Sequence, residues 1–287
     1  DMVLISRTMT SLGFDAATTE FITSSVSAWA GKISMVVNSI AMGLTVSLIP
    51  NIVEAFTLKK WELVESRLNK ALQIILVTCI PMVLGISLLA TPIWSVFYGT
   101  EQLELGGLVL AVYIFVSLFF NLYMVTSSTL QSLNKFKAVY FTTLLGYITN
   151  ALLDVPFMLI CNALGLEPFI GAILASVCGY SLSVFTALRV LKKEQKLKYG
   201  DTFKTLLKTL VPATVMVVVV LLLKMAVPVN YASKASCILY IAVISIIGAI
   251  VYLVIAYKQG LLDKVFGREY LNKIIKKITF GKINLKA

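Results

Sequence analysis

Long runs without a charged residue constrain the fold of this chain more than any other feature. Five windows contain no Asp, Glu, Lys or Arg, and two more hold only one or two charges. Each reaches about the 20 apolar residues that a helix needs to cross the hydrocarbon core of a bilayer. We therefore expect seven complete transmembrane helices, at 33–53, 71–100, 105–134, 138–162, 168–188, 207–228 and 235–257.

Two other interpretations of these runs fail. A soluble protein of 31.5 kDa cannot bury seven consecutive apolar helices, and only 14% of the residues are charged, against about 25% in an average soluble domain. Strands of a membrane barrel alternate in hydrophobicity over about ten residues, which these longer runs exceed. The apolar stretch 2–12, after Asp1, is too short to cross and indicates a truncated span. The predicted fold class is an all-α polytopic membrane bundle, with seven complete transmembrane helices plus one truncated at the N-terminus.

The residue types present weaken several classes of function. The chain has no histidine, so acid–base catalysis and metal binding through imidazole are absent. The four cysteines are widely spaced and form no CxxC motif, which favours apolar fillers within helices. No GxxxxGK, DFG or GxSxG pattern marks a nucleotide or hydrolase site. We expect a transporter rather than an enzyme, with no cofactor and no metal.

Positive charge is distributed unevenly between the two sides of the membrane. Twenty-one of the 25 Lys and Arg residues fall in alternate exposed segments, at 54–70, 129–137, 189–208 and 258–287. Lys and Arg collect on the cytoplasmic side, so we expect a multi-pass plasma-membrane protein with a cytoplasmic C-terminus. This placement of the net charge of +11 argues against a nucleic-acid partner.

Two cytoplasmic segments have amphipathic patterns. In 52–68, apolar residues fall near helical spacing and Trp61 serves as an interfacial anchor, while the tail 258–287 sets an apolar face against lysines and an arginine. Such helices lie in the headgroup layer and meet anionic lipid. For the tail, an orientation anchor and a regulatory or partner-binding role both remain open.

Basic residues within the apolar spans are costly and therefore informative. Lys32 is predicted to lie one or two turns from the outer end of its span, where it either reaches the outer surface or lines a water-filled cavity that binds an anion. Arg7 lies in the truncated span, at a depth that the sequence does not fix. Lys224, one turn from an outer end, is expected to reach the surface.

One deep carboxylate stands out. Asp154 is preceded one turn earlier by Asn150 and followed by Pro156, which should kink the helix. A carboxylate in this position needs a cation, a proton or a basic partner, and the alternatives of ion coupling and helix–helix pairing stay open.

A proline-containing motif closes the first complete span. Pro50 cannot donate to a helical hydrogen bond and disfavours helical geometry in the residue before it, so we expect a helix terminator at the cytoplasmic interface. Asn38 and Ser47 on the same helix would add polar groups to a cavity wall.

The order of these motifs resembles a known superfamily. The residues that carry the resemblance are Asp1 to Arg7 (DMVLISR), Gly13, Ala28, Gly31 and 43–50 (GLTVSLIP), followed by Ala71, Pro81, Gly85, Pro92 and 97–99 (FYG). They resemble the polysaccharide-transporter branch of the multidrug/oligosaccharidyl-lipid/polysaccharide flippases. The stage V sporulation protein B group is most similar, and MurJ-type lipid II flippases are near relatives. Many relatives have proline where Asn38 stands, which puts the local kink there in doubt.

The resemblance implies an architecture of two lobes and fourteen spans. This chain would supply the C-terminal lobe in 1–206, two additional spans in 207–257 and the basic amphipathic tail in 258–287. Its partners would be membrane lipids, the missing N-terminal lobe and a lipid-linked saccharide of bacterial cell-wall or polysaccharide synthesis.

The resemblance also implies a mechanism. Rocking of the two lobes would carry an undecaprenyl-diphosphate head across the membrane. Lys32 and Arg7 match basic, cavity-facing positions of the eighth and seventh spans, and Asn38 would join them in binding substrate. The last two spans would flank a groove for the lipid tail. The alternatives are a cation-coupled multidrug exporter of the same superfamily, which favours Asp154, and a scaffold for wall synthesis, which favours the tail.

Overall fold

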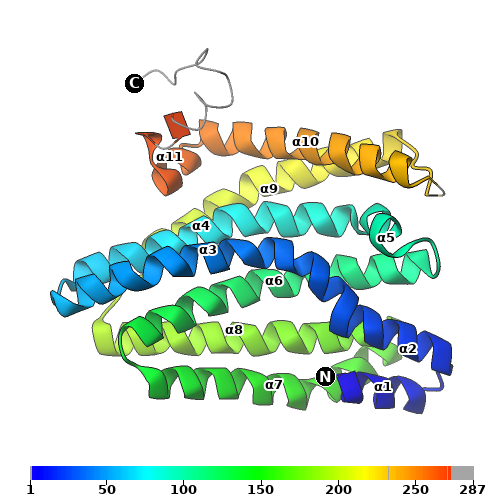
Figure 1. Cartoon of the computed structure of the whole chain (residues 1–287), viewed down its shortest axis with the longest axis horizontal. Coiled ribbons are helices and arrows are strands. Elements are labelled where there is room, and N and C mark those ends of the chain that lie inside the picture. Colours follow the sequence, from blue (N-terminus) through cyan, green and yellow to red (C-terminus); the bar gives the residue numbers. More distant parts are fainter. Residues whose placement is uncertain (1, 232, 270, 273–287) are drawn as a thin grey trace.

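Helices form wherever the apolar runs predict them. The computed structural model describes residues 2–231, 233–269 and 271–272, and within them it contains helices and no strand (Figure 1). Seven helical stretches are long and apolar enough to cross a membrane, which confirms the predicted fold class. The elements are α1 (Met2–Ser11), α2 (Ala16–Ser24), η1 (Ser25–Trp29), α3 (Ala30–Thr57), α4 (Trp61–Leu88), α5 (Ala90–Tyr98), α6 (Leu103–Ser132), α7 (Phe136–Ala163), α8 (Pro168–Gln195), α9 (Gly200–Ala226), α10 (Lys234–Lys258) and α11 (Leu261–Phe266).

The first complete span is longer than predicted. The helices α2 and α3 join through η1, a single turn of π-helix, into one stretch of 42 residues from Ala16 to Thr57. At 1.5 Å per residue this stretch is about 60 Å long, twice the hydrocarbon thickness of a bilayer. We call the end of the bundle near the α3–α4 turn the inner end, because it carries the predicted cytoplasmic loops, and the opposite end the outer end.

The segment 52–68 is not the separate interfacial helix that its pattern suggests. It forms the end of α3, a short turn and the start of α4, and these two helices project together at the inner end (Figure 1). Ile52 and Ala55 of α3 are buried in one apolar cluster with Val64 and Leu68 of α4. The buried apolar residues of this segment are therefore explained by packing of α3 against α4 rather than by contact with lipid.

Pro50 does not terminate its helix, and that prediction is wrong. The helix α3 continues for seven residues beyond Pro50, to Thr57. Side chains supply hydrogen bonds around the proline: Asn51 Nδ2 donates to the Ser47 carbonyl (2.6 Å), and Arg67 of α4 donates to the Asn51 carbonyl. The packing of α3 against α4 thus holds the helix together at a residue that weakens it.

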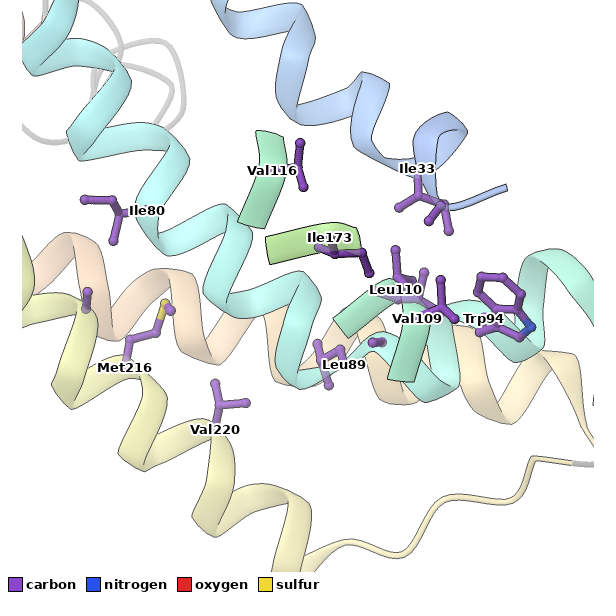
Figure 2. Close-up of a cluster of buried hydrophobic side chains, with 14 of the residues drawn as sticks. Ile33, Ile80, Leu89, Trp94, Val109, Leu110, Val116, Ile173, Met216 and Val220 are labelled. Carbon is purple, nitrogen blue, oxygen red and sulfur yellow. The ribbon is translucent and has the colours of Figure 1, made fainter. Parts of the chain in front are cut away.

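The center of the bundle consists of α3, α4, α6 and α8, with α7 against α8 on one side and α9 and α10 against α4 on the other (Figure 1). Figure 2 shows a buried apolar cluster that draws on most of these helices. Its labelled members are Ile33, Ile80, Leu89, Trp94, Val109, Leu110, Val116, Ile173, Met216 and Val220. The window 71–100 divides within this region into α4 and the short α5.

Small residues allow α7 and α8 to approach closely. A Cβ atom added at Gly171 would lie 2.3 Å from the backbone of Phe157, and one added at Gly146 would lie 2.7 Å from the Gly179 carbonyl oxygen. Helices in lipid gain contact in this way because small residues let their backbones meet. The helix α7 runs through Pro156 without ending.

At the inner end, hydrogen bonds join α4 to the start of α9 and to the segment just before it. Asn69 of α4 is buried; its Nδ2 donates to the Lys198 carbonyl (2.8 Å), and its Oδ1 accepts from Thr202 (2.6 Å). Glu65 accepts a hydrogen bond from the Lys198 amide (2.9 Å). The predicted boundary at residue 206 falls within α9, and the division of the chain there stays a prediction.

The tail begins with α11, whose Leu261, Leu262 and Val265 are buried. This helix contacts α4, α9 and α10, so its apolar face packs on protein rather than standing alone in the headgroup layer. Most of the remaining amphipathic tail lies outside the described residues.

The close α7–α8 approach predicts that Gly171→Ala destabilises the protein. The added methyl group has no space against the Phe157 backbone, and overpacking of this kind costs about 1–3 kcal/mol. We expect a lower apparent melting temperature in detergent. Gly43→Ala is the matched control, because a Cβ there meets nothing within 4 Å. Equal melting temperatures for the two variants would contradict the packing.

Candidate functional site

Lys32 lies on a face of α3 that has no partner among the described residues. Lys32 is exposed, and the other exposed residues of α3 near it fall on the same side of the helix: Met35, Val36, Ser39, Met42, Gly43 and Val46. The opposite side, with Ile33, Val37 and Ala41, is buried. Lys32 thus stands at the outer end of an uncovered surface that is apolar apart from Ser39.

The depth of Lys32 differs from the prediction of one or two turns from the outer end. Sixteen residues of helix precede it from Ala16, which places it about 24 Å along the stretch. A Cβ at the neighbouring Gly31 would lie 3.7 Å from the hydroxyl of Tyr113, which is about 15 Å from the outer end of α6. Lys32 therefore lies well inside the bundle, near the middle of the 42-residue stretch. A charge at membrane depth requires a water-filled cavity or a partner.

Arg7 lines a second polar feature, a groove between α1 and α2 with a volume of about 520 Å³. Glu20, Thr19 and Thr23 of α2 line the same groove, so it contains charges of both signs. The α1–α2 turn is fixed by Gly13, whose φ is +89°, and by Asp15, which accepts a hydrogen bond from the Thr18 amide (3.0 Å). Hydrogen bonds from the Thr18 side chain and from the Thr18 amide hold the pKa of the Asp15 carboxyl below its usual value.

Asn38 is half-buried at the edge of the exposed face of α3. Its side-chain oxygen is buried without a hydrogen-bond partner in the part of the chain that the structure describes. A neighbouring asparagine from α6, Asn121, is fully buried and donates to the Val37 carbonyl and to Cys79, each at 3.3 Å. The α3–α6 contact thus contains polar groups at the depth of the membrane.

A tyrosine-lined cavity lies between α1, η1, α6, α7 and α8, with a volume of about 460 Å³. Asn150 lines it, and a smaller adjoining pocket shares Asn150, Tyr147, Ser176 and Tyr180. Sequence reasoning missed this cavity. The signal was present, since Ser176, Gly179, Tyr180 and Ser183 repeat at helical spacing in an apolar run.

Asp154 is fully buried in α7, with 0% of its surface exposed. Neither of its carboxylate oxygens has a hydrogen-bond partner among the described residues. The helix contacts α1 and α8. The pairing of Asp154 with a cation or a basic group therefore stays a prediction, as does a role for Asn150.

An apolar groove of about 430 Å³ runs between α4, α9, α10 and α11. Pro81, Met82 and Gly85 line it from α4, while Gly248 and Tyr252 line it from α10. At its outer end Lys224 donates to the carbonyl of Leu88 (2.5 Å), so this lysine is held by the end of α4. The last two spans thus flank an apolar groove, and its use by a lipid tail stays a prediction.

The structure distributes the predicted site residues rather than gathering them into one pocket. Lys32 and Asn38 lie on α3, Arg7 lines the α1–α2 groove, and Asn150 and Asp154 belong to α7. The exposed face of α3 and the α1–α2 groove are the two surfaces that carry basic residues. Together they offer positive charge at two depths of the membrane.

Comparison with known proteins gives one consistent answer. The family model of lipid II flippase MurJ matches residues 16–243. Lipid II flippase MurJ of Bacillus subtilis (strain 168) is 31% identical over 242 residues, which cover 83% of this chain and 43% of that protein. A solved structure, lipid II flippase MurJ in its inward closed conformation, shares the fold with a TM-score of 0.66 at 20% identity, over 83% of this chain and 47% of that one. The chain spans less than half the length of these relatives.

A water-facing Lys32 predicts selective chemical labelling. The test protein is a chimera in which this chain replaces the matching part of the Bacillus subtilis relative, with the four native cysteines changed to alanine. We expect a water-soluble maleimide to modify Lys32→Cys in membranes, because thiols react as thiolates and these form in water. Leu152→Cys is the matched control, since Leu152 is 68% exposed on α7 at similar depth. Equal modification of both positions would contradict a cavity at Lys32.

Proposed function

This chain belongs to the MurJ lipid II flippase family, and from that membership we propose that it forms one lobe of a bacterial plasma-membrane flippase. The cargo is an undecaprenyl-diphosphate-linked saccharide for cell-wall synthesis, which moves from the inner to the outer leaflet. The observation that carries the proposal is Lys32, a charged residue near the middle of a 42-residue apolar helical stretch, on a face that no described residue covers. The chain acts as a transporter, and its C-terminus is cytoplasmic.

The chemistry of the cargo explains the need for this charge. A diphosphate that leaves water loses its hydration, and a charge-assisted hydrogen bond from an ammonium group compensates part of that loss. Lys32 offers such a contact deep in the membrane, and Arg7 offers another near the outer end of the α1–α2 groove. The two positions suit successive stages of a path toward the outer leaflet.

The uncovered face of α3 accounts for the need for a second lobe. Alternating access requires two lobes that rock around one site, and this chain supplies the wall that carries Lys32 and Asn38. The apolar residues beside Lys32 would meet the second lobe when the cavity closes. The partner of this lobe is the N-terminal lobe of the same transporter.

The groove between α4, α9 and α10 suits the lipid tail. It lies away from Lys32, on the other side of α4, and its lining is apolar along the length of the helices. A long polyprenyl chain remains in an apolar environment there while its head crosses through the polar cavity. The two additional spans thereby gain a role in handling the substrate.

A cation-coupled multidrug exporter is the second candidate. It is favoured by Asp154, a carboxylate that is fully buried at membrane depth in α7. In the flippase, the same residue and Asn150 would couple transport to a cation or pair helices. The two functions differ in whether the phosphate-binding lysine or the carboxylate is indispensable.

Flipping by the chimera tests the proposed function. A fluorescent undecaprenyl-diphosphate lipid in liposomes is protected from a membrane-impermeant quencher until it changes leaflet. We expect the chimera to flip this lipid and the isolated chain not to, because one lobe cannot close a site. Lys32→Gln should lower the rate roughly ten- to hundredfold, the equivalent of about 1.5–3 kcal/mol for a hydrogen bond to a charged group.

The results of these experiments distinguish the flippase from the multidrug exporter. Full activity of Lys32→Gln in a folded chimera would contradict the flippase mechanism, and flipping by the isolated chain would contradict the two-lobe architecture. Export of a lipophilic cation that is lost in Asp154→Asn, without any flipping, would establish the exporter.

Filling the apolar groove tests the place of the lipid tail. A Cβ at Gly85 meets nothing within 4 Å, and Gly85 lines the groove, so Gly85→Leu adds side-chain volume to the groove. We expect several-fold slower flipping and unchanged thermal stability, because the tail loses space while the packing is kept. Gly85→Ala, which adds one methyl group, should flip at nearly the original rate. An undiminished rate for Gly85→Leu would exclude this groove as the path of the tail.

A further inference from the structure

Two lysines meet at the inner end of the apolar groove. Lys70 of α4 donates from Nζ to the Lys264 carbonyl of α11 (2.9 Å). Lys70 precedes Val77, which lines the groove on the same helix, by seven residues or about 10 Å. Leu262 and Phe266 of α11 also line the groove, so the helix that carries Lys264 forms part of its wall.

At the inner end of the groove, Lys264 has an ion-pair partner, whereas Lys70 has none among the described residues. Lys264 Nζ lies 3.7 Å from Asp201 Oδ1. Among the described residues, this carboxylate is the only one within ion-pair distance of either lysine. Lys70 is half-buried, and its ammonium group repels that of Lys264. An ammonium group has three donors, and the carbonyl contact of Lys70 uses one. Lys70 therefore has no carboxylate partner among the described residues, and its ammonium group has donors to spare.

We propose that this inner end binds the phosphate of an anionic phospholipid of the inner leaflet, with an acyl chain of that lipid in the groove. The apolar lining favours a lipid over a free phosphate ion, since the anion alone would leave the groove empty. The groove volume of about 430 Å³ falls within the range of ligand pockets. Lysines near the membrane surface attract anionic lipids over neutral ones.

The site lies at the end of the bundle where the headgroups of the inner leaflet are expected. The cluster of Lys70, Lys264 and Asp201 lies at the inner end, where α9 begins and α10 has ended. Lipid phosphates lie at that level, just outside the hydrocarbon core. Binding of a phospholipid there does not require that the protein transport a substrate. The inference therefore stands without the proposed function. If both hold, the phospholipid and the tail of the cargo compete for one groove.

Lipid retention by the whole chain tests the proposal. The chain is purified from nanodiscs that contain equal amounts of phosphatidylglycerol and phosphatidylethanolamine, and the bound lipids are counted by native mass spectrometry. We expect enrichment of phosphatidylglycerol in the original protein. Lys70→Gln should lower that enrichment about fivefold, the effect of one lysine near the surface. Inorganic phosphate at millimolar concentration should not displace the lipid.

Matched variants separate charge from structure. Lys70→Arg keeps the charge and should keep the enrichment, whereas loss in this variant would indicate a structural role and overturn the proposal. Lys204→Gln is the control, because Lys204 is exposed at the same end and, among the described residues, has no hydrogen bond or ion pair with Lys70, Lys264 or Asp201. Gly85→Leu should lower retention of both lipids. Unchanged enrichment in Lys70→Gln, an equal loss in Lys204→Gln, or displacement by phosphate would also overturn it. None of these readouts depends on flipping.

Discussion

The cost of placing charge and unpaired polar groups in hydrocarbon governs this structure. In the described residues, the backbone groups of the spans avoid this cost by pairing with one another within helices. Near Pro50, where one helical hydrogen bond is missing, Asn51 and Arg67 supply hydrogen bonds. Side chains avoid this cost less completely. Lys32 stays exposed on an apolar face of a membrane-spanning helix, where a charge needs water, an anion or a partner. We therefore propose that this face lines a cavity.

The bundle has two surfaces of opposite character, separated by α4 and its neighbours. One is the face of α3 with Lys32; the other is the apolar groove between α4, α9 and α10. A substrate with a charged head and a long apolar tail needs both. Each end of the groove has a lysine that donates to a helix carbonyl, Lys224 at the outer end and Lys70 at the inner end. Charged residues thus lie beside the two ends of the groove, whereas its lining contains none.

The number and order of the spans could be predicted from the sequence because hydrophobic run length is a local property. The membership of the flippase family was also predictable, from the order of glycines and prolines. The depth of Lys32 was not, since charge-free windows do not show that the helix starts at Ala16. Pro50 and the segment 52–68 were misinterpreted for the same reason: their conformation depends on packing between α3 and α4. The tyrosine cavity required the approach of α7 to α8, which depends on Gly146 and Gly171 meeting a neighbouring backbone.

The π-helical turn η1 has a consequence for how this lobe can vary. It joins α2 to α3 at Ser25–Trp29, and a π-turn holds one residue more than the α-helix it interrupts. Because the wider turn takes up that extra residue, deletion of a single residue there would restore a regular helix with almost the same rotation of α2 relative to α3. Glu20 and Thr23 would then continue to line the groove with Arg7, and Lys32 would keep its place. A deletion in the regular helix on either side would instead rotate the outer groove by about 100° relative to Lys32. The π-turn is therefore a position where this helix can change its length by one residue without changing which side chains face each other.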